Sequence, residues 1–540
     1  MPINNKRIER ERERRLNRRQ PPESGTHPTN QTKARPADGP LFQVEQEPQR
    51  EAPDKRQWYE PSPEAMAQKD TFPFERYFVI LCLIFGCLFV FLTPPFQAPD
   101  EVTHFLKSYS LSRLQLIPTV EDGTVMDTMD SEVLAFANSF AGLQYDANSK
   151  IDFSTISSWG NVYTTGSSDN AEQTTYITVN AYIVYYVPQA LGMGFAHLLN
   201  MSVLWTLFMG RLFNLLFYIL VLYYAIKTTP VAKNIFFLVA LTPMAVFQAA
   251  SLSYDVMVTS VCVLFTAHML RLFFDPDWEL SNGEFAWILV LSCLLIFMKT
   301  VYFPLVLLFL AIPREKFADS EERRKNFLEI VGTSVAVFII VTLFRKFAYA
   351  GVVSSNSLTS DQITAALSDP NFFFQMIGNT FNAFGSEFSE EFIGKLGWLD
   401  TALPPWLITM YYGMLIASLF EFSPYECGLI ERVQPEKLFR MVVSVILALF
   451  FFVVLLFAVF YFIMTLVTLQ AAGSTVAQGI QGRYFIPVGF LGFSTIGVIL
   501  NYRFNIGDWF YELMKKYNVI FIVLAQMVSI VTMYLRYYVS

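Results

Sequence analysis

Three side chains able to exchange or hold a proton stand together after the first apolar run of the chain. Asp100, Glu101 and His104 follow Pro99 in this segment. Pro99 suits the first turn of a helix, where the helix dipole and the unpaired backbone N–H groups favour an ionised carboxylate at Asp100. A spacing of four places His104 on the same helix face. The pattern predicts two carboxylates and an imidazole on one surface; the alternative is an N-capping aspartate with solvated neighbours.

Further ionisable residues interrupt or border apolar stretches, where a charge is costly and usually functional. They are Asp255, Lys299, Asp400 and Arg483. Each of the first three also has a purely structural interpretation: Asp255 as a helix cap, Lys299 as an anchor at the membrane interface, and Asp400 as a turn residue. Arg211, near the start of its apolar run, is expected to extend its guanidinium group toward the membrane surface.

The elements that position these residues must be membrane helices. Over 540 residues the mean hydropathy is +0.38 and only 16% of the residues are charged, which excludes a soluble domain of this length. Five cysteines and four histidines are too few for a disulfide-framed secreted module or a Cys/His metal scaffold. Four of the cysteines lie inside apolar runs, so we expect all five to be packing thiols.

The N-terminal segment, residues 1–70, is rich in Arg, Glu, Gln and Pro and has no apolar periodicity, so we expect a disordered tail. Its first 19 residues hold eight bases and three acids. RNA binding is one interpretation of this charge, but contact with anionic membrane lipid explains it as well. We expect membrane lipid, and no nucleic acid, as a partner.

The distribution of charge predicts the orientation of the chain. Residues 77–92 form an apolar run without a signal-peptide cleavage site and are expected to be a retained anchor. Between residues 94 and 179 there are 11 acidic and 3 basic residues, whereas the tail has a positive balance. Basic segments remain in the cytoplasm. The tail is therefore expected inside the cell, and residues 94–179 form the first extracytoplasmic loop, which would carry the active site.

The remaining apolar runs predict an all-α, polytopic protein of the plasma membrane with about 11 transmembrane helices, in one domain over residues 71–540. The expected spans lie near residues 77–92, 205–226, 233–252, 255–273, 284–298, 301–313, 328–348, 405–421, 439–466, 484–502 and 518–537. Residues 176–199 are expected to form a juxtamembrane helix, because a crossing there would move Lys227 and Lys233 outside. Residues 350–405 form a second large extracytoplasmic loop, and Arg345 precedes it on the outer side.

Six strings carry a resemblance to a family of uncharacterised bacterial integral membrane proteins. They are residues 94–105, Tyr185-Tyr186-Val187-Pro188-Gln189-Ala190, Gly210-Arg211-Leu212-Phe213-Asn214, the segment from Ala250 to Asp255, Gly397-Trp398-Leu399-Asp400 and Gln481-Gly482-Arg483-Tyr484. The resemblance covers about residues 75–500. That family is in turn similar in layout to the GT-C glycosyltransferases, which have one span, a large outer loop with an acidic pair near its start, and then many spans. This second likeness is one of architecture, so the function must be argued from the site.

The GT-C likeness implies transfer of a sugar from a polyprenyl-phosphate carrier to an extracytoplasmic acceptor such as a cell-wall or surface polysaccharide. It implies Asp100 as the general base of an inverting displacement. Glu101 and Asp255 would orient the acceptor or hold a divalent cation such as Mg or Mn, and His104 and Asp400 would line the substrate site. Basic groups would neutralise the lipid phosphate, and two aromatic rings would contact sugar. The bases are Lys299, Arg483 and Arg345, and the rings are Trp398 and Tyr484.

Other functions remain open at this point. A transporter or flippase of lipid-linked sugars would also need cationic groups at the outer surface, but it predicts inverted repeats and paired charges near the bilayer midplane, neither of which the sequence contains. A polysaccharide polymerase would have arginine-rich loops, whereas the first loop is acidic. A scaffold whose tail recruits partners is a further alternative. A sugar donor of this kind would be made by a partner enzyme, a polyprenyl-phosphate sugar synthase.

Overall fold

The computed structural model is mostly helical. It describes residues 72–116, 119–121, 124–164, 171–175, 183–348, 370–468, 475–504 and 508–539. The expected disordered tail, residues 1–70, lies outside this described part of the chain.

Seven helices are long and apolar enough to cross a membrane. They are α3 (Phe74–Leu92), α9 (Val203–Thr228), α12 (Asp255–Phe274), α14 (Ser320–Ala348), α19 (Pro435–Thr468), α20 (Ile486–Arg503) with the preceding turn η6 (Gly482–Phe485), and α21 (Asp508–Tyr538). Each coincides with a run that the sequence predicted. The chain is therefore a membrane protein with several apolar helices.

The other four expected spans correspond to short or interrupted helices. One is divided into α10 (Lys233–Ala240) and α11 (Pro243–Ala249), because Pro243 starts a new helix whose first turn is capped by the Thr242 side chain. The others are α13 (Asn282–Met298), the 3₁₀ helix η4 (Thr300–Ala311) and α17 (Pro405–Ser418). At 1.5 Å per residue, a 14-residue helix such as α17 spans about 21 Å, less than the roughly 30 Å hydrocarbon core.

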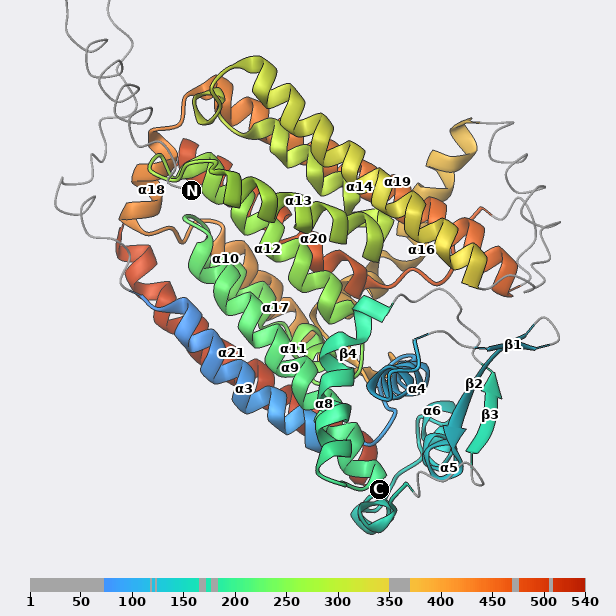
Figure 1. Cartoon of the computed structure of the whole chain (residues 1–540). Helices are drawn as coiled ribbons and strands as arrows, with labels where there is room; N and C mark the ends of the chain where they lie inside the picture. Colours follow the sequence, from blue (N-terminus) through green and yellow to red (C-terminus); the bar gives the residue numbers. More distant parts are fainter. Residues whose placement is uncertain are drawn as a thin grey trace, which may run out of the picture. The chain divides into compact units, whose positions relative to one another are not determined.

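The first loop is folded and contains strands, which the all-α prediction omitted. Its helices are α4 (Glu101–Ser112), α5 (Ser131–Asn138), α6 (Ala141–Tyr145) and α7 (Phe153–Ser158). Its strands are β1 (Thr119–Glu121), β2 (Thr124–Asp130) and β3 (Ala171–Thr175), which form an antiparallel sheet in the order β1-β2-β3. Figure 1 shows α4 and this sheet together at the end of the bundle opposite α18 (Pro424–Glu431).

The run expected to form a juxtamembrane helix contains η3 (Ile183–Tyr186) and the 12-residue helix α8 (Val187–Leu198), which is too short to cross a bilayer. It packs closely on α9, since a Cβ at Gly192 would lie 2.2 Å from the Met209 carbonyl oxygen. The second large loop contains a 24-residue helix, α16 (Pro370–Ile393), followed by the two-stranded β4 (Lys395–Leu396) and β5 (Thr401–Ala402). Sequence analysis did not predict α16.

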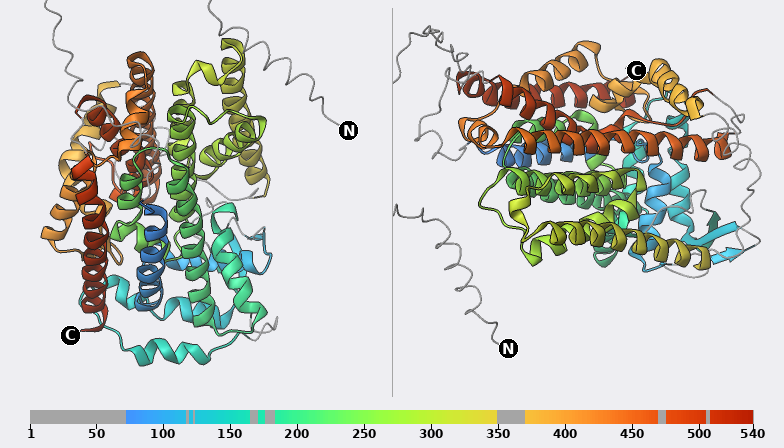
Figure 2. Two further views of the ribbon diagram at one scale, coloured as in Figure 1. Left: turned by 90° about the vertical axis from the view of Figure 1, so that its left-hand side faces the viewer. Right: turned by 90° about the horizontal axis from the view of Figure 1, so that it is seen from above.

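Helix α12 forms the centre of the bundle. It is buried along almost its whole length and packs against α9, α13 and α20. Helix α3 packs against α9 on one side and α21 on another, as Figure 1 and Figure 2 show. All five cysteines are free, and Cys82, Cys262 and Cys427 are buried, as expected for packing thiols. One end of the bundle holds the starts of α4, α12 and η6 and the end of α13.

Candidate functional site

Asp100 stands at the turn that joins the first membrane helix to α4. The helix begins at Glu101, so Asp100 is its N-cap and Pro99 precedes the helix, contrary to the prediction that Pro99 lies in the first turn. The backbone of Asp100 is left-handed, with φ 61° and ψ 13°, and its side chain makes no capping hydrogen bond. The carboxylate is exposed. Aspartate is one of the few non-glycine residue types that adopt this conformation readily, and the turn leaves the carboxylate facing solvent.

Glu101, the neighbour of Asp100, is bound to Arg211. Both side chains are fully buried, and the guanidinium Nε and Nη2 donate to Oε1 and Oε2 of Glu101 at 2.8 and 2.7 Å. The remaining N–H groups donate at 2.8–3.1 Å to backbone carbonyl oxygens around the end of α3, those of Val90, Thr93 and Pro94. The prediction that Arg211 extends toward the membrane surface is therefore wrong. Its five donors tie α9 to the segment that leads into Asp100.

The Glu101 carboxylate also accepts a hydrogen bond from the backbone N–H of Leu252, at 3.1 Å from Oε1. The start of α4 is thus joined to the turn that precedes α12. With both oxygens occupied inside the protein, Glu101 presents no free atom to a substrate. Its place in the structure is that of a residue that fixes the position of Asp100.

A second group of charged side chains lies where three helix ends meet, around Asp255, the first residue of α12. The Lys299 ammonium, at the break between α13 and η4, lies 2.6 Å from Oδ1 of Asp255. The Nε of Arg483, in η6, lies 3.7 Å from Oδ2. Sequence analysis singled out all three residues, and the structure brings them together. Two cations share one carboxylate, so the trio has an excess of one positive charge.

Arg483 retains unused hydrogen-bonding capacity. Its side chain is 4% exposed, and its Nε has no hydrogen-bond acceptor in the part of the chain that the structure describes. Buried donors without acceptors are rare in native proteins, and this donor is free to bind a ligand or a water. An anion placed beside Lys299 and Arg483 would satisfy this donor.

Aromatic rings surround the Lys299 ammonium. The Tyr484 ring centroid lies 4.3 Å and the Tyr254 centroid 5.0 Å from Nζ, distances typical of cation–π contacts. The hydroxyl of Tyr302 donates to the backbone carbonyl of Tyr484 at 2.8 Å and fixes this ring's segment against η4. The lysine is therefore held in place from several sides, and it is not a mobile interface anchor.

His104 connects the α4 helix to this cluster. Its Nδ1 lies 3.0 Å from the hydroxyl of Tyr186, and its ring packs edge-on against Tyr254 at 5.1 Å. Burial lowers the pKa of His104 to about 3, so the imidazole is neutral near pH 7 and acts as a hydrogen-bonding group. Asp100, one turn earlier, is near enough for its charge to act on Arg483 and Tyr186. The exposed carboxylate and the cationic cluster thus belong to one site.

Trp398 and Asp400 lie in the β4–β5 turn. The indole Nε1 of Trp398 donates to the carbonyl of Phe96 at 2.9 Å, which places the ring beside the turn that leads to Asp100. Asp400 instead forms a two-pronged ion pair with Arg536 of α21, at 2.8 and 3.0 Å. Its other oxygen accepts from the Trp398 backbone N–H at 3.1 Å. Asp400 therefore positions Trp398, and no contact joins it to the Asp255 cluster within the described residues.

The carboxylates expected to hold a divalent cation do not fit that role. Both oxygens of Glu101 are bound to Arg211, and Asp255 is neutralised by Lys299 and Arg483. In the described ranges, no group of three or more His, Cys, Asp or Glu side chains has the arrangement of a metal site. The side chain of Arg345 lies outside the described residues.

Three contributors to this region were not expected from the sequence. Tyr186 and Tyr254 lie within two of the six strings that carry the resemblance, but no role was expected for them. Arg536 carried no signal, since it lies in the last turn of a long apolar helix, where a base is common.

Comparison with known proteins gives one match. Residues 83–491 match the model of a family described as predicted membrane protein (DUF2142). No curated protein and no solved structure matches the chain.

Proposed function

We propose that this chain, which belongs to the DUF2142 family of predicted membrane proteins, is a membrane glycosyltransferase of GT-C type. The geometry of its site supports this proposal. The protein transfers a sugar from a polyprenyl-phosphate carrier to a hydroxyl group of an extracytoplasmic polysaccharide. The observation that carries the proposal is the pairing of an exposed Asp100 with a buried cationic cluster in which the Nε of Arg483 has no acceptor among the described residues.

The cationic cluster suits the lipid phosphate. It lies at the ends of membrane helices, where a polyprenyl chain can remain in the bilayer while its phosphate reaches Lys299 and Arg483. Charge-assisted hydrogen bonds from these groups stabilise the negative charge that the leaving phosphate gains as the reaction proceeds. Asp255 limits the excess charge and aligns both cations.

The exposed carboxylate suits a general base. In the proposed step the acceptor hydroxyl oxygen attacks the anomeric carbon, and the bond from that carbon to the phosphate oxygen breaks. The polyprenyl phosphate leaves with the bonding electron pair, and Asp100 takes the hydroxyl proton. Trp398, beside the Phe96 carbonyl, offers a ring face to a sugar, and Tyr484 lies against Lys299 on the donor side.

The first prediction concerns sidedness. Residues 94–179 should be extracytoplasmic, because the acidic loop and the positive tail require it under the positive-inside rule. A cysteine placed at Gly142, where a Cβ meets no atom within 4 Å, should be labelled by an impermeant thiol reagent in intact cells. A cysteine at Lys437, near the opposite end of the bundle, is the control and should react only after lysis. The reverse pattern would contradict the proposed extracytoplasmic reaction.

The second prediction tests the donor site directly. Lys299→Ala and Arg483→Ala should each weaken binding of purified polyprenyl phosphate by about 10- to 100-fold, as expected for loss of hydrogen bonds to a charged group. The matched control is Arg503→Ala, at the exposed far end of α20, the helix that follows η6; this variant should bind as wild type does. Binding would be measured by equilibrium titration in detergent, after size exclusion has shown that each variant is folded.

Unchanged affinity in both variants would remove the cluster from the donor site. If vesicles containing wild-type protein moved lipid-linked sugar across the bilayer without transferring it, the flippase would replace the transferase. The first result would exclude the proposed donor site, and the second would exclude the proposed reaction.

A further inference from the structure

Helix α16 holds the segment that carries Arg483. Along its length, three polar side chains of α16 bond to the backbone of residues 475–482. The bonds are Asn379 Nδ2 to the Thr475 carbonyl at 3.3 Å, the Ala477 N–H to Thr380 Oγ1 at 2.9 Å, and the Gly482 N–H to a carboxylate oxygen of Glu391. Because this segment is not part of a regular helix, these bonds fix the path of its backbone.

The closest approach is at Gly482, the residue before Arg483. A Cβ built on Gly482 would lie 2.0 Å from the carbonyl oxygen of Phe388 in α16, so only glycine fits there. The backbone of η6 is therefore pressed against α16 at the point where the arginine side chain departs. A small displacement of α16 would move the guanidinium group.

Glu391 is the charged member of this contact. Its side chain is buried, at 3% exposed, and burial raises the pKa of its carboxyl group. The neighbouring lysine, Lys395, pairs with Glu387. The Glu391 carboxylate is thus committed to the Gly482 backbone, although a buried carboxylate is costly where a neutral acceptor would serve.

We infer that Glu391 is a positioning residue for the donor phosphate: it holds Gly482 and so aims the Arg483 side chain at the phosphate of the polyprenyl carrier. This inference rests on the proposed function. Glu391 holds the backbone that leads into Arg483, and its charge also acts on the guanidinium group.

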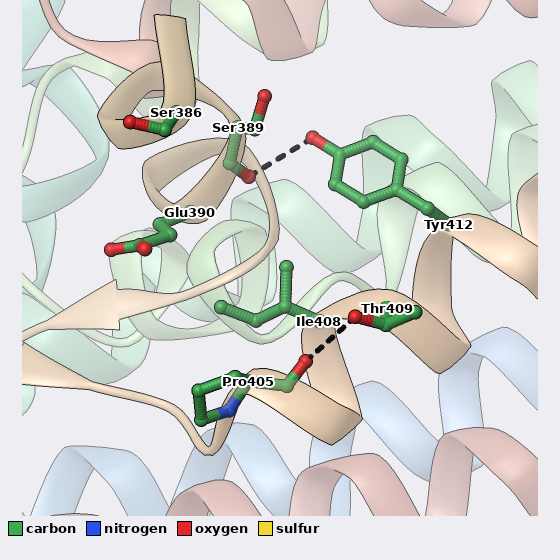
Figure 3. Close-up of a pocket in the computed structure, with 7 residues that line it drawn as sticks. All are labelled: Ser386, Ser389, Glu390, Pro405, Ile408, Thr409 and Tyr412. Atoms are coloured by element: carbon green, nitrogen blue, oxygen red, sulfur yellow. Dashed lines mark hydrogen bonds between the residues drawn. The ribbon is translucent and has the colours of Figure 1, made fainter. Parts of the chain in front are cut away.

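Neighbouring positions on α16 supply a matched control. Figure 3 shows Glu390 with Ser386 and Ser389 on the wall of a separate pocket of about 400 Å³, which also includes Tyr412 of α17. Glu390 is the adjacent residue with the same side chain, but among the described residues it is the Glu391 carboxylate that accepts from the Gly482 N–H. Glu391→Gln keeps an oxygen acceptor for the Gly482 N–H and removes the charge.

The experiment is titration of polyprenyl phosphate against the purified full-length variants. Glu391→Ala should weaken binding about tenfold, because a buried N–H loses its acceptor. Glu391→Gln and Glu390→Ala should stay within about twofold of wild type. In a background of Arg483→Ala, the Glu391→Ala change should have no further effect, since two residues that act through one contact are not additive. A merely structural role would weaken binding in both backgrounds, and that result would overturn the inference.

A measurement without ligand separates this inference from the proposed function. Hydrogen exchange of the peptide covering residues 480–485 should be faster in Glu391→Ala than in wild type, Glu391→Gln or Glu390→Ala. If wild type bound no polyprenyl phosphate, the donor proposal would fail, and so would the aiming role that depends on it. If wild type bound donor but exchange and affinity were the same in all variants, Glu391 alone would be excluded.

Discussion

Replacing Asp100 by asparagine is expected to lower sugar transfer by about 10²–10⁴-fold, the usual contribution of a general base. Expression and thermal stability should stay near those of wild type. Asparagine tolerates the left-handed backbone conformation at least as well as aspartate does, and there is no side-chain capping bond at this position to lose. The substitution therefore removes the proton acceptor and the charge while it preserves the turn.

The measurement is the rate of transfer from a purified lipid-linked donor, beside a melting curve for each variant. Asp152→Asn is the matched control: Asp152 is also exposed, is also an N-cap without a side-chain capping bond, and lies in the same loop. It should transfer sugar at the wild-type rate. Equal rates in the two variants would exclude Asp100 as the base, and a lower melting temperature in Asp100→Asn would indicate a structural role.

The cationic cluster is the part of the site that the sequence predicted best. Lys299 interrupts a long apolar stretch, and Asp255 and Arg483 stand where other apolar runs begin, so one end of the helix bundle brings them near one another. Hydropathy also located the seven long helices, because a membrane span is a run of about 20 consecutive, mostly apolar residues. Both signals are local along the chain.

The parts that were not predicted depend on partners distant in sequence. Arg211 was expected near the membrane surface because no residue close to it in the sequence indicates a partner. Its acceptor, Glu101, lies 110 positions away. Asp400 was assigned to the substrate site, but its partner, Arg536, is 136 positions away. A buried ion pair leaves no periodic pattern from which either contact could be inferred.

Helix α16 was not predicted for another reason. Its sequence mixes Phe with Asn, Ser, Gln and Glu, so it lacks the continuous apolar character of a span. It packs on η6 and α11, with much of its surface exposed. Hydropathy finds helices that are apolar along their whole length, such as α12, and it is a poor guide to a helix of mixed composition such as α16.

Arg211→Met is expected to produce the largest loss of stability of any single change discussed. The substitution leaves Glu101 buried without its partner and three carbonyl oxygens without a donor. Breaking a buried pair by removing one member costs about 3–5 kcal/mol. The loss would be measured by denaturant or thermal unfolding in detergent. Arg503→Met, an exposed arginine changed in the same way, should have little effect.

A double variant separates the charge from the packing. In Arg211→Met with Glu101→Met, no charge is left buried, and replacing both members of a buried pair by apolar residues is often neutral. The double variant should therefore be more stable than Arg211→Met alone, although the carbonyl oxygens at the end of α3 still lack a donor and the Leu252 N–H now loses its acceptor as well. Its sugar transfer should nevertheless stay low, because the bonds that hold the turn before Asp100 are gone. Recovery of stability together with full transfer would show that the ion pair does not position the base.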